Sequence, residues 1–242
     1  MANTQYIKYI WGVKMYLSKS SLKLYENCPL AWKMRYVDRL KPPSTAKYRH
    51  GLELHDILNK FFDCYTIRKD MPVPLFSVRQ HYAEEFRFFV KNEQERYKRL
   101  LQAGKPHYFM PVARELKCRN SRLKLFGIID RIDRNTDNGY TLVEYKTSSR
   151  LDDELLNNFI DDMAFYTVLL EGSQFNINKW HIIVTGAKKA VELNVNSSLC
   201  FTIRERIEKV FNSIQSRFFE PAEDINACAY CDYVVYCRRW IE

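Results

Sequence analysis

The sequence has no long apolar stretch, and none of its runs approaches the ~18 residues that a membrane-spanning helix requires. It also lacks three glycine-containing patterns, those of P-loop nucleotide binding, of dinucleotide binding and of serine hydrolases. Near its start, Lys8 and Lys14 interrupt the apolar residues, so this segment does not resemble a secretory signal. These absences argue against a membrane protein and against those three classes. They predict an intracellular protein, in the cytoplasm of a cell or of a host cell.

A disulfide framework is missing as well, because seven cysteines form an odd set in a chain expected inside a cell. Three of them, Cys228, Cys231 and Cys237, lie within ten residues. An all-thiolate metal centre needs about four sulfur ligands, so one more must come from elsewhere. Spacing alone does not distinguish zinc from an iron–sulfur cluster. The remaining cysteines in helix or strand patterns are assigned to packing: Cys64, Cys118 and Cys200.

Basic residues exceed acidic ones, 38 against 29, which gives a formal net charge of +9. This excess favours a polyanionic partner such as nucleic acid, although it does not require one. Basic residues gather at 96–99, at Lys188-Lys189 and at Arg238-Arg239. Aromatic residues make up 14% of the chain, and some could stack on unpaired bases while most serve the core.

Hydrophobic periodicity predicts an α/β fold in one domain that spans residues 1–242. Helices are expected at 18–36, 51–65, 76–102, 153–171 and 197–219. Strands are expected at 107–118, 122–134, 140–147 and 179–187, with an edge strand at 189–195. Proline-containing breaks fall at 41–44 and 71–74. Three meandering strands, a helix and another strand favour a small mixed sheet flanked by helices.

Two of the predicted strands carry carboxylates in their middle. Gly127–Asp133 and Leu142–Thr147 alternate between apolar and charged residues, and a polar turn at Asn135–Gly139 separates them. Charged groups in a half-buried strand are costly unless something compensates them, and a divalent cation is a common compensation. The hairpin is therefore a candidate metal site.

The length of the turn decides which carboxylates meet. If the loop has five residues, Asp130 lies directly across from Glu144, about 5 Å away at Cβ. Lys146 then shares the face of Glu144, because it follows two residues later. If the loop has only two residues, Asp133 lies across from Glu144 instead. The sequence leaves both registers open.

These motifs resemble a known family. Gly127-x-x-Asp130 followed by Glu144-x-Lys146 is similar to the active-site signature of the PD-(D/E)XK nuclease superfamily. More narrowly, the chain resembles the RecB-type branch, with AddB-like nuclease domains and CRISPR-associated iron–sulfur exonucleases. Gly51-x-x-x-His55 resembles the branch's metal-binding histidine motif, and residues 18–29 resemble its opening helix. The matches extend from about residue 16 to residue 239.

The resemblance implies a restriction-endonuclease-like fold with four segments. These are an opening helix at 16–40, a helical insert at 51–104, a nuclease core at 107–195 and a terminal helix with a cysteine loop at 197–242. It also implies that Cys28 joins the three cysteines near the end of the chain as ligands of a [4Fe–4S] cluster, a staple between the two ends. Structural zinc is the alternative.

The activity implied is that of a divalent-metal-dependent deoxyribonuclease, more often exonuclease than endonuclease, acting on single strands or DNA ends. Lys146 would orient the attacking water or stabilise charge on the phosphate. Glu115, before the hairpin, either lies near this site or is structural. The Mn²⁺ or Mg²⁺ ligands implied are His55, Asp130, Glu144 and the backbone carbonyl of Tyr145.

One position departs from the family pattern. The helix after the hairpin usually carries Gln-x-x-x-Tyr, whose two side chains help to seat the nucleic acid, and here these are Asp162 and Tyr166. A carboxylate there would repel phosphate unless it is protonated, paired or metal-bound. This departure supports an alternative. The chain could be a catalytically weak or inactive DNA-binding subunit of a CRISPR adaptation or recombination complex, with an integrase or helicase as partner.

Overall fold

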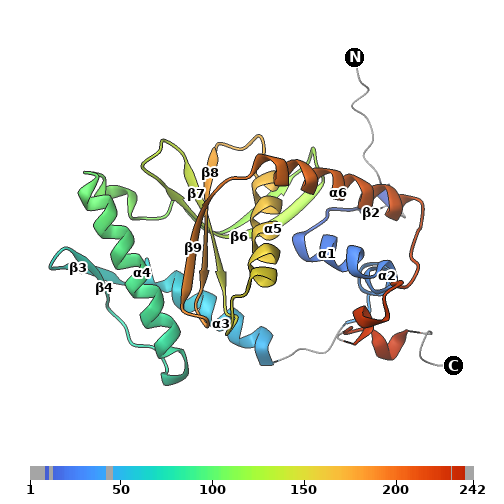
Figure 1. Cartoon of the computed structure of the whole chain (residues 1–242), viewed down its shortest axis with the longest axis horizontal. Helices are drawn as coiled ribbons and strands as arrows, with labels where there is room; N and C mark the ends of the chain where they lie inside the picture. Colours follow the sequence, from blue (N-terminus) through green and yellow to red (C-terminus); the bar gives the residue numbers. More distant parts are fainter. Residues whose placement is uncertain (1–8, 11–12, 42–45, 230, 238–242) are drawn as a thin grey trace, which may run out of the picture. The chain divides into compact units, whose positions relative to one another are not determined.

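A computed structural model of the chain describes residues 9–10, 13–41, 46–229 and 231–237 (Figure 1). The chain divides into two compact units. Unit 1 comprises residues 1–44, 119–127 and 201–242, and unit 2 comprises residues 45–118 and 128–200. None of the helices in the described part of the chain combines the length and apolar character of a membrane span.

The elements follow one another in a mixed order of helices and strands. The helices are α1 (Lys19–Asn27), α2 (Pro29–Tyr36), α3 (Ala46–Phe61), α4 (Ala83–Gln102), α5 (Asp153–Leu169) and α6 (Ser197–Gln215). The strands are β1 (Tyr9–Ile10), β2 (Val13–Lys14), β3 (Tyr65–Arg68), β4 (Met71–Pro74), β5 (Ala113–Asn120), β6 (Leu125–Arg134), β7 (Tyr140–Lys146), β8 (Ile177–Val184) and β9 (Lys189–Asn194). Short 3₁₀ turns occur at Gln80–Tyr82, Pro106–Tyr108, Ile225–Cys228 and Val234–Tyr236.

The central sheet has five strands in the order β5-β6-β7-β8-β9. β7 pairs antiparallel with β6 and parallel with β8, and β9 adds an antiparallel edge. Helix α5 makes the crossover that the parallel pair requires (Figure 1). The predicted meander, helix and strand are therefore confirmed, as is the mixed sheet flanked by helices.

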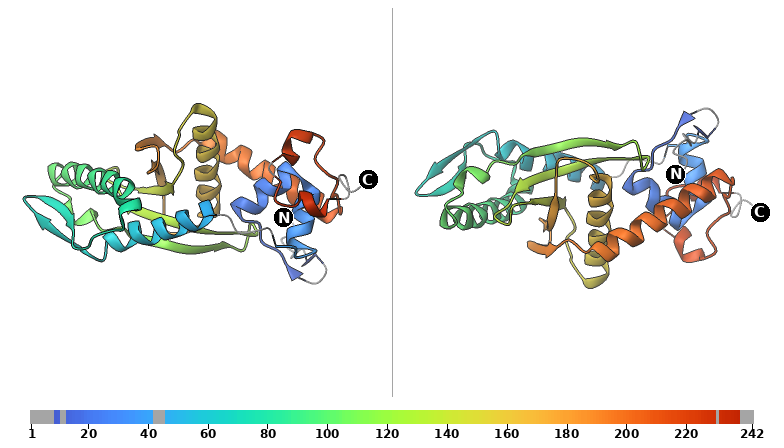
Figure 2. Two further views of the ribbon diagram at one scale, coloured as in Figure 1. Left: turned by 90° about the horizontal axis from the view of Figure 1, so that it is seen from below. Right: turned by 90° about the horizontal axis from the view of Figure 1, so that it is seen from above.

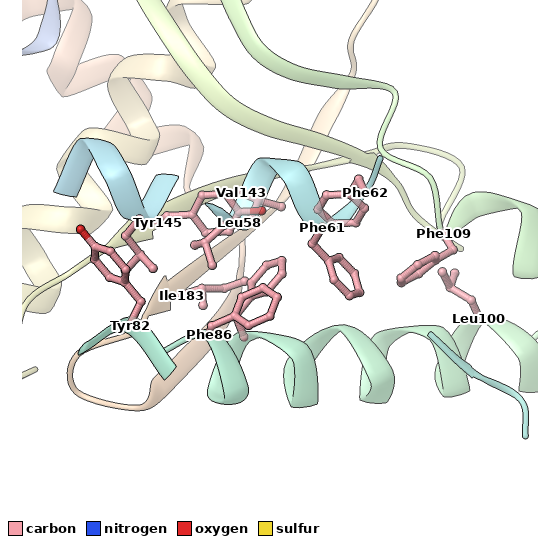
Figure 3. Close-up of a cluster of buried hydrophobic side chains, with 12 residues drawn as sticks. Leu58, Phe61, Phe62, Tyr82, Phe86, Leu100, Phe109, Val143, Tyr145 and Ile183 are labelled. Atoms are coloured by element: carbon pink, nitrogen blue, oxygen red, sulfur yellow. The ribbon is translucent and has the colours of Figure 1, made fainter. Parts of the chain in front are cut away.

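Helices cover both faces of the sheet within unit 2. α3 and α4 enclose an apolar cluster with side chains of β7 and β8 on one face (Figure 3). On the other face, the indole of Trp180 in β8 donates to Thr167 Oγ1 of α5 at 2.9 Å. Because side chains alternate along a strand, β7 sends Val143 and Tyr145 into the first layer. The cluster consists of Leu54, Leu58, Phe61, Phe62, Tyr82, Phe86, Phe89, Leu100, Phe109, Val143, Tyr145 and Ile183.

The predicted helical insert contains a hairpin that the sequence pattern did not reveal. Residues 71–74 were expected to form a break, but they form β4, paired with β3 and lying alongside α4 (Figure 2). Lys69 and Asp70 link the two strands with φ angles of 50° and 55°, the backbone of a two-residue turn that usually selects Asn-Gly. Pro72 and Pro74 are tolerated because this sheet has only two strands. Helix α4 accordingly begins at Ala83 rather than at residue 76.

The opening helix predicted at 18–36 is two helices. Ser18 caps α1 by accepting a hydrogen bond from the backbone N–H of Ser21 at 3.1 Å, and α1 ends before Cys28. Cys28 has an extended backbone, φ −161° and ψ 105°, because the proline that follows disfavours the helical region for it. Pro29 then starts α2, where its missing N–H costs nothing.

Unit 1 is held together by contacts between α1, α2 and the end of the chain. Trp32, only 1% exposed, donates to Ser21 Oγ at 2.8 Å and stacks on Phe219 with a ring separation of 5.9 Å. The guanidinium of Arg206 donates two hydrogen bonds to the Glu26 carboxylate, at 2.7 and 2.8 Å. Segments almost two hundred residues apart in the sequence therefore share one small core.

Candidate metal centre

The register of β6 and β7 is that of the five-residue loop. Arg134 pairs with Tyr140, and the ladder continues to Arg131 paired with Val143. Continued by one residue, this register sets Asp130 across from Glu144. The alternative, with Asp133 across from Glu144, is wrong because Asp133 pairs with Thr141.

Asp130 takes a hydrogen bond from the neighbouring strand. The backbone N–H of Tyr145 donates to Asp130 Oδ2 at 2.8 Å, a buried interaction. This hydrogen bond fixes the Asp130 carboxylate next to the last pair of the β6–β7 ladder, Arg131 with Val143. The other carboxylate oxygen of Asp130 lies 3.5 Å from Nδ1 of His55, which α3 supplies.

Three ligand-type side chains converge at this point. The nitrogen of His55 and carboxylate oxygens of Glu115 and Asp130 all lie within 4.8 Å of one another. Glu115 belongs to β5 and has a φ of 45°, a left-handed backbone that is uncommon for a residue with a side chain. Strained backbone conformations of this kind are common at active sites and ligand-binding sites. The sequence left the place of Glu115 open, and the structure puts it beside His55 and Asp130.

The neighbouring carboxylates shift the pKa values of His55 and Glu115. Burial lowers the pKa of His55, but the hydrogen bond and charge of Asp130, with Glu144 and Glu115, outweigh it and raise the pKa overall. Partial burial and the charge of Asp130 raise the pKa of Glu115. Both shifts have the direction expected when carboxylates are crowded around one imidazole.

Beside the trio, Lys146 links two further carboxylates. Its ammonium nitrogen lies 2.8 Å from Glu144 Oε1 and 2.8 Å from Asp162 Oδ2. Asp162 comes from α5 and is 5% exposed. The acid at the position of the family's glutamine is therefore buried and paired with Lys146. Tyr166, one turn along α5, is buried against the same groups, and burial followed by the charges of Glu144 and Asp130 raises its pKa.

We call the six residues that carry these contacts the acidic site: His55, Glu115, Asp130, Glu144, Lys146 and Asp162. It holds four carboxylates and one ammonium, so it is negative even when the imidazole is protonated. Three of these carboxylates, those of Asp130, Glu144 and Asp162, are buried and require positive charge nearby. One imidazole nitrogen with two or three carboxylates is a donor set that suits Mn²⁺ and tolerates Mg²⁺. The residues present therefore fit a divalent cation.

A second group of charges, which was not expected from the sequence to form a cluster, lies in the α3/α4 layer. We call it the core ion cluster: Glu93, Arg96, Arg131 and Asp133. Arg131 Nη1 donates to Glu93 Oε1 at 2.8 Å, and its other terminal nitrogen lies 2.9 Å from Asp133 Oδ2. Arg96 Nε donates to Glu93 Oε2 at 2.8 Å. Two acids and two bases balance here, although Asp133 Oδ1 has no hydrogen-bond partner among the described residues.

This cluster changes how the basic segment at 96–99 is interpreted. Arg96 is 8% exposed and turned inward, and Arg99 is paired with Glu192 at 2.6 Å. Lys188, in the second basic segment, is paired with Glu84. Arg238-Arg239 lies outside the described residues. Arg96, Arg99 and Lys188 of these runs are therefore paired with acidic side chains of the protein.

Four cysteines lie close together in unit 1. Cys28, Cys228, Cys231 and Cys237 line one small cavity with apolar side chains that include Met34. The thiol of Cys28 accepts a hydrogen bond from the backbone N–H of Ala31 at 3.4 Å and so caps α2. Burial raises the pKa of Cys231, a backbone hydrogen bond at Tyr233 opposes it, and the three other thiols raise it further.

Comparisons with known proteins agree with this geometry. A family model of the PD-(D/E)XK nuclease superfamily matches residues 16–238, and the chain belongs to this superfamily. A solved structure of a candidate exonuclease from Eubacterium rectale aligns with a TM-score of 0.52 at 10% identity, covering 92% of this chain and 88% of the other. That likeness shows the fold. The solved structure of SSO0001 aligns with a TM-score of 0.36 at 16% identity, over 79% of this chain and 98% of the other. No curated protein matches the sequence.

Proposed function

We propose that the chain is a divalent-metal-dependent deoxyribonuclease that shortens single strands or ends of DNA. The observation that carries the proposal is the acidic site, where a superfamily signature coincides with four carboxylates around one imidazole and one ammonium. The formal net charge of +9 supports a polyanionic substrate.

His55, Glu115 and Asp130 would hold the cation, with Glu144 and the carbonyl of Tyr145 completing the set that the resemblance implies. When bound, the cation lowers the pKa of a coordinated water and polarises the phosphate. Lys146 presents its ammonium to the phosphate oxygens or to the attacking water. The carboxylates of Glu144 and Asp162, each 2.8 Å away, hold that ammonium in place.

Tyr166 and Asp162 would act on the DNA strand in different ways. The buried phenol of Tyr166 stays neutral and contributes its ring and hydroxyl at the edge of the site. Asp162 acts through Lys146 rather than on phosphate, because its charge is matched by that ammonium. This pairing removes the repulsion that an acid at this position would otherwise cause.

Cleavage of end-labelled DNA tests the proposal. Linear and circular substrates, single- and double-stranded, are incubated with Mn²⁺, Mg²⁺ or chelator. We expect metal-dependent shortening of linear single strands and little cleavage of circles. Lys146→Met serves as the inactive control, since it removes the ammonium and keeps an unbranched side chain. Cleavage that is equal in wild type and this variant would assign the activity to a contaminant.

The replacement of the family's glutamine by Asp162 supports a second candidate, a DNA-binding subunit with little activity in a CRISPR adaptation or recombination complex. A protein of that kind shifts DNA in gels without shortening it in any metal. Co-purification of an integrase or helicase from the native host would favour it. Metal-dependent cleavage by the isolated chain would exclude it.

We further propose that the four cysteines of unit 1 hold a [4Fe–4S] cluster. Four thiolates, of which Cys28 also receives a backbone N–H, form a donor set that iron–sulfur clusters and zinc both accept. Tetrahedral zinc would bring the sulfurs to about 4 Å from one another. The resemblance of Cys228-x2-Cys231-x5-Cys237 to the branch's cluster-binding triplet is what favours iron–sulfur over zinc.

Metal analysis after anaerobic purification separates these alternatives. We expect a brown protein with broad visible absorbance, and loss of that absorbance in Cys28→Ser and Cys231→Ser. Cys200→Ser, which changes a buried thiol away from the cavity, should keep the colour. A colourless protein with one zinc per chain would overturn the cluster.

A further inference from the structure

One tyrosine connects the acidic site with the core ion cluster. From its backbone, Tyr145 donates to Asp130 Oδ2 at 2.8 Å. From its side chain, it presents its ring edge-on to the imidazole of His55, with centroids 5.7 Å apart and planes at 89°. Tyr145 therefore touches two residues of the candidate cation site, one through hydrogen bonding and one through packing.

The far end of the same side chain is fixed in the α3/α4 layer. The Tyr145 hydroxyl accepts a hydrogen bond from Arg131 Nη1 at 2.8 Å. The guanidinium also lies over the tyrosine ring, 5.6 Å from its centroid, and Phe89 packs against the ring at 5.8 Å. The ring consequently has little room to tilt, because one end is bonded and the other is enclosed.

Arg131 is held in turn by Glu93. The same Nη1 that reaches Tyr145 donates to Glu93 Oε1 at 2.8 Å, and both residues are at most 1% exposed. Arg96 adds a second contact to Glu93 and donates to the backbone carbonyl of Phe109. Burial raises the pKa of Glu93, but the two arginines outweigh it and lower the pKa to about 2, so the pair stays ionised.

We propose that the buried Glu93–Arg131 ion pair positions Asp130 and His55 through Tyr145, so that the core ion cluster sets the cation affinity of the acidic site. The proposal rests on the proposed metal-dependent function. Apolar side chains can replace a buried ion pair without loss of stability, so stability alone does not account for the pair. A contact chain that ends on two cation ligands gives it a further role, comparable to the outer contacts that orient metal ligands elsewhere.

Tyr145→Phe tests the proposal with the smallest change. It keeps the ring and the backbone N–H and removes only the hydroxyl that Arg131 holds. Binding of Mn²⁺ to the full chain without DNA is measured by the electron paramagnetic resonance of free Mn²⁺. We expect affinity to fall about tenfold, the lower end of the loss seen when outer contacts of a metal ligand are removed.

Tyr82→Phe is the matched control. Tyr82 belongs to the same apolar cluster, is 3% exposed and also loses a hydroxyl bonded to a carboxylate, Glu53 at 2.6 Å. This variant should bind Mn²⁺ as wild type does. Equal affinity of Tyr145→Phe and wild type would overturn the positioning role, as would an equal loss in both variants.

Glu93→Gln extends the test one step further from the site. It should weaken Mn²⁺ binding in the same direction, and the double variant with Tyr145→Phe should be no weaker than the more severe single one. If the losses of Mn²⁺ affinity in the two single variants were additive in the double variant, Glu93 would not act through Tyr145, and the proposed relay from Glu93 through Tyr145 to the acidic site would be overturned. In cleavage assays, the half-activating Mn²⁺ concentration of Tyr145→Phe should rise about tenfold.

The outcomes separate this inference from the function on which it rests. If wild type neither binds Mn²⁺ nor cleaves DNA, the proposed function fails and the relay fails with it. If wild type does both and Tyr145→Phe matches it, only the relay fails.

Discussion

The acidic site and the core ion cluster are two groups of charges that both include residues of β6, and they differ in charge balance. The core ion cluster pairs two carboxylates with two guanidiniums. The acidic site has four carboxylates and a single ammonium. A balanced group can remain buried by itself, whereas an unbalanced one needs a cation from outside. We infer that unbalanced charge, more than burial, distinguishes the candidate functional site from the core ion cluster.

The sharpest test of this comparison replaces one aspartate by asparagine in each of the two groups. Asp130→Asn should reduce cleavage by about 10³-fold or more, since a charge that stabilises the reacting centre is lost. Its free energy of unfolding should stay the same or rise, because repulsion among carboxylates is relieved. Single-turnover cleavage and urea unfolding measure the two effects.

Asp133→Asn, three residues along β6, is the matched partner. It should retain cleavage within about tenfold and lose about 1–3 kcal/mol of stability, since Arg131 loses a charged partner. If both variants lost activity equally with unchanged stability, the distinction between the two groups would collapse.

Arg131→Met tests the balanced group directly. It leaves the carboxylates of Glu93 and Asp133 buried without their shared partner, so the free energy of unfolding should fall by about 3–5 kcal/mol. Urea denaturation followed by circular dichroism measures the change. Lys146→Met should cost less, about 1–3 kcal/mol, because the Lys146 side chain is 17% exposed whereas that of Arg131 is fully buried. The reverse order of the two losses would contradict the comparison.

His181, beside the core ion cluster, predicts a dependence of stability on pH. Burial lowers its pKa from 6.5 to about 4, against the opposing charge of Glu192. Below pH 6.5 the unfolded chain takes up a proton that the folded chain refuses until about pH 4. Its contribution to stability is therefore complete above pH 6.5 and is lost as the pH falls toward 4, by up to about 3 kcal/mol.

Unfolding of His181→Gln between pH 7 and pH 4 checks this prediction. The variant should lose this part of the pH dependence, whereas His107→Gln, which changes an exposed histidine, should follow wild type. Parallel curves for all three proteins would show that His181 does not contribute.

The smallest effect is expected at Asp162. Asp162→Asn keeps a hydrogen-bond acceptor for Lys146 but removes one negative charge near the phosphate. We expect the KM for DNA to fall about threefold at low salt with kcat within about twofold, and the difference to fade as salt screens the site. A large loss of kcat would mean that the charge of Asp162, and not only its hydrogen bond, orients Lys146.

Much of the sheet could be predicted because its signals are local. Alternating residues on either side of a polar turn predicted β6 and β7. The sequence left two registers open, and the structure has the one with the five-residue loop. The β3–β4 hairpin was missed, since Lys69-Asp70 is not a usual turn pair and two prolines argue against a strand. The helix break at Cys28 was also missed, although the Cys-Pro dipeptide signals it.

The two charge groups show where sequence reasoning stops. The family resemblance pointed to His55, Asp130, Glu144 and Lys146 as candidate site residues, but the approach of Glu115 depends on a left-handed backbone that no sequence pattern predicts. Charged residues at 131 and 133 of β6 lie on a face that turns out to be covered by α4. Only tertiary packing shows that Glu93 of α4 meets them.

The backbone hydrogen bond from Tyr145 to Asp130 has a consequence of its own. A peptide N–H bonded to a side chain is protected from deuterium only while that side chain stays in position. The exchange rate of this single proton therefore records how often the Asp130 carboxylate swings away. It would report the mobility of one candidate ligand in solution, before any DNA is added.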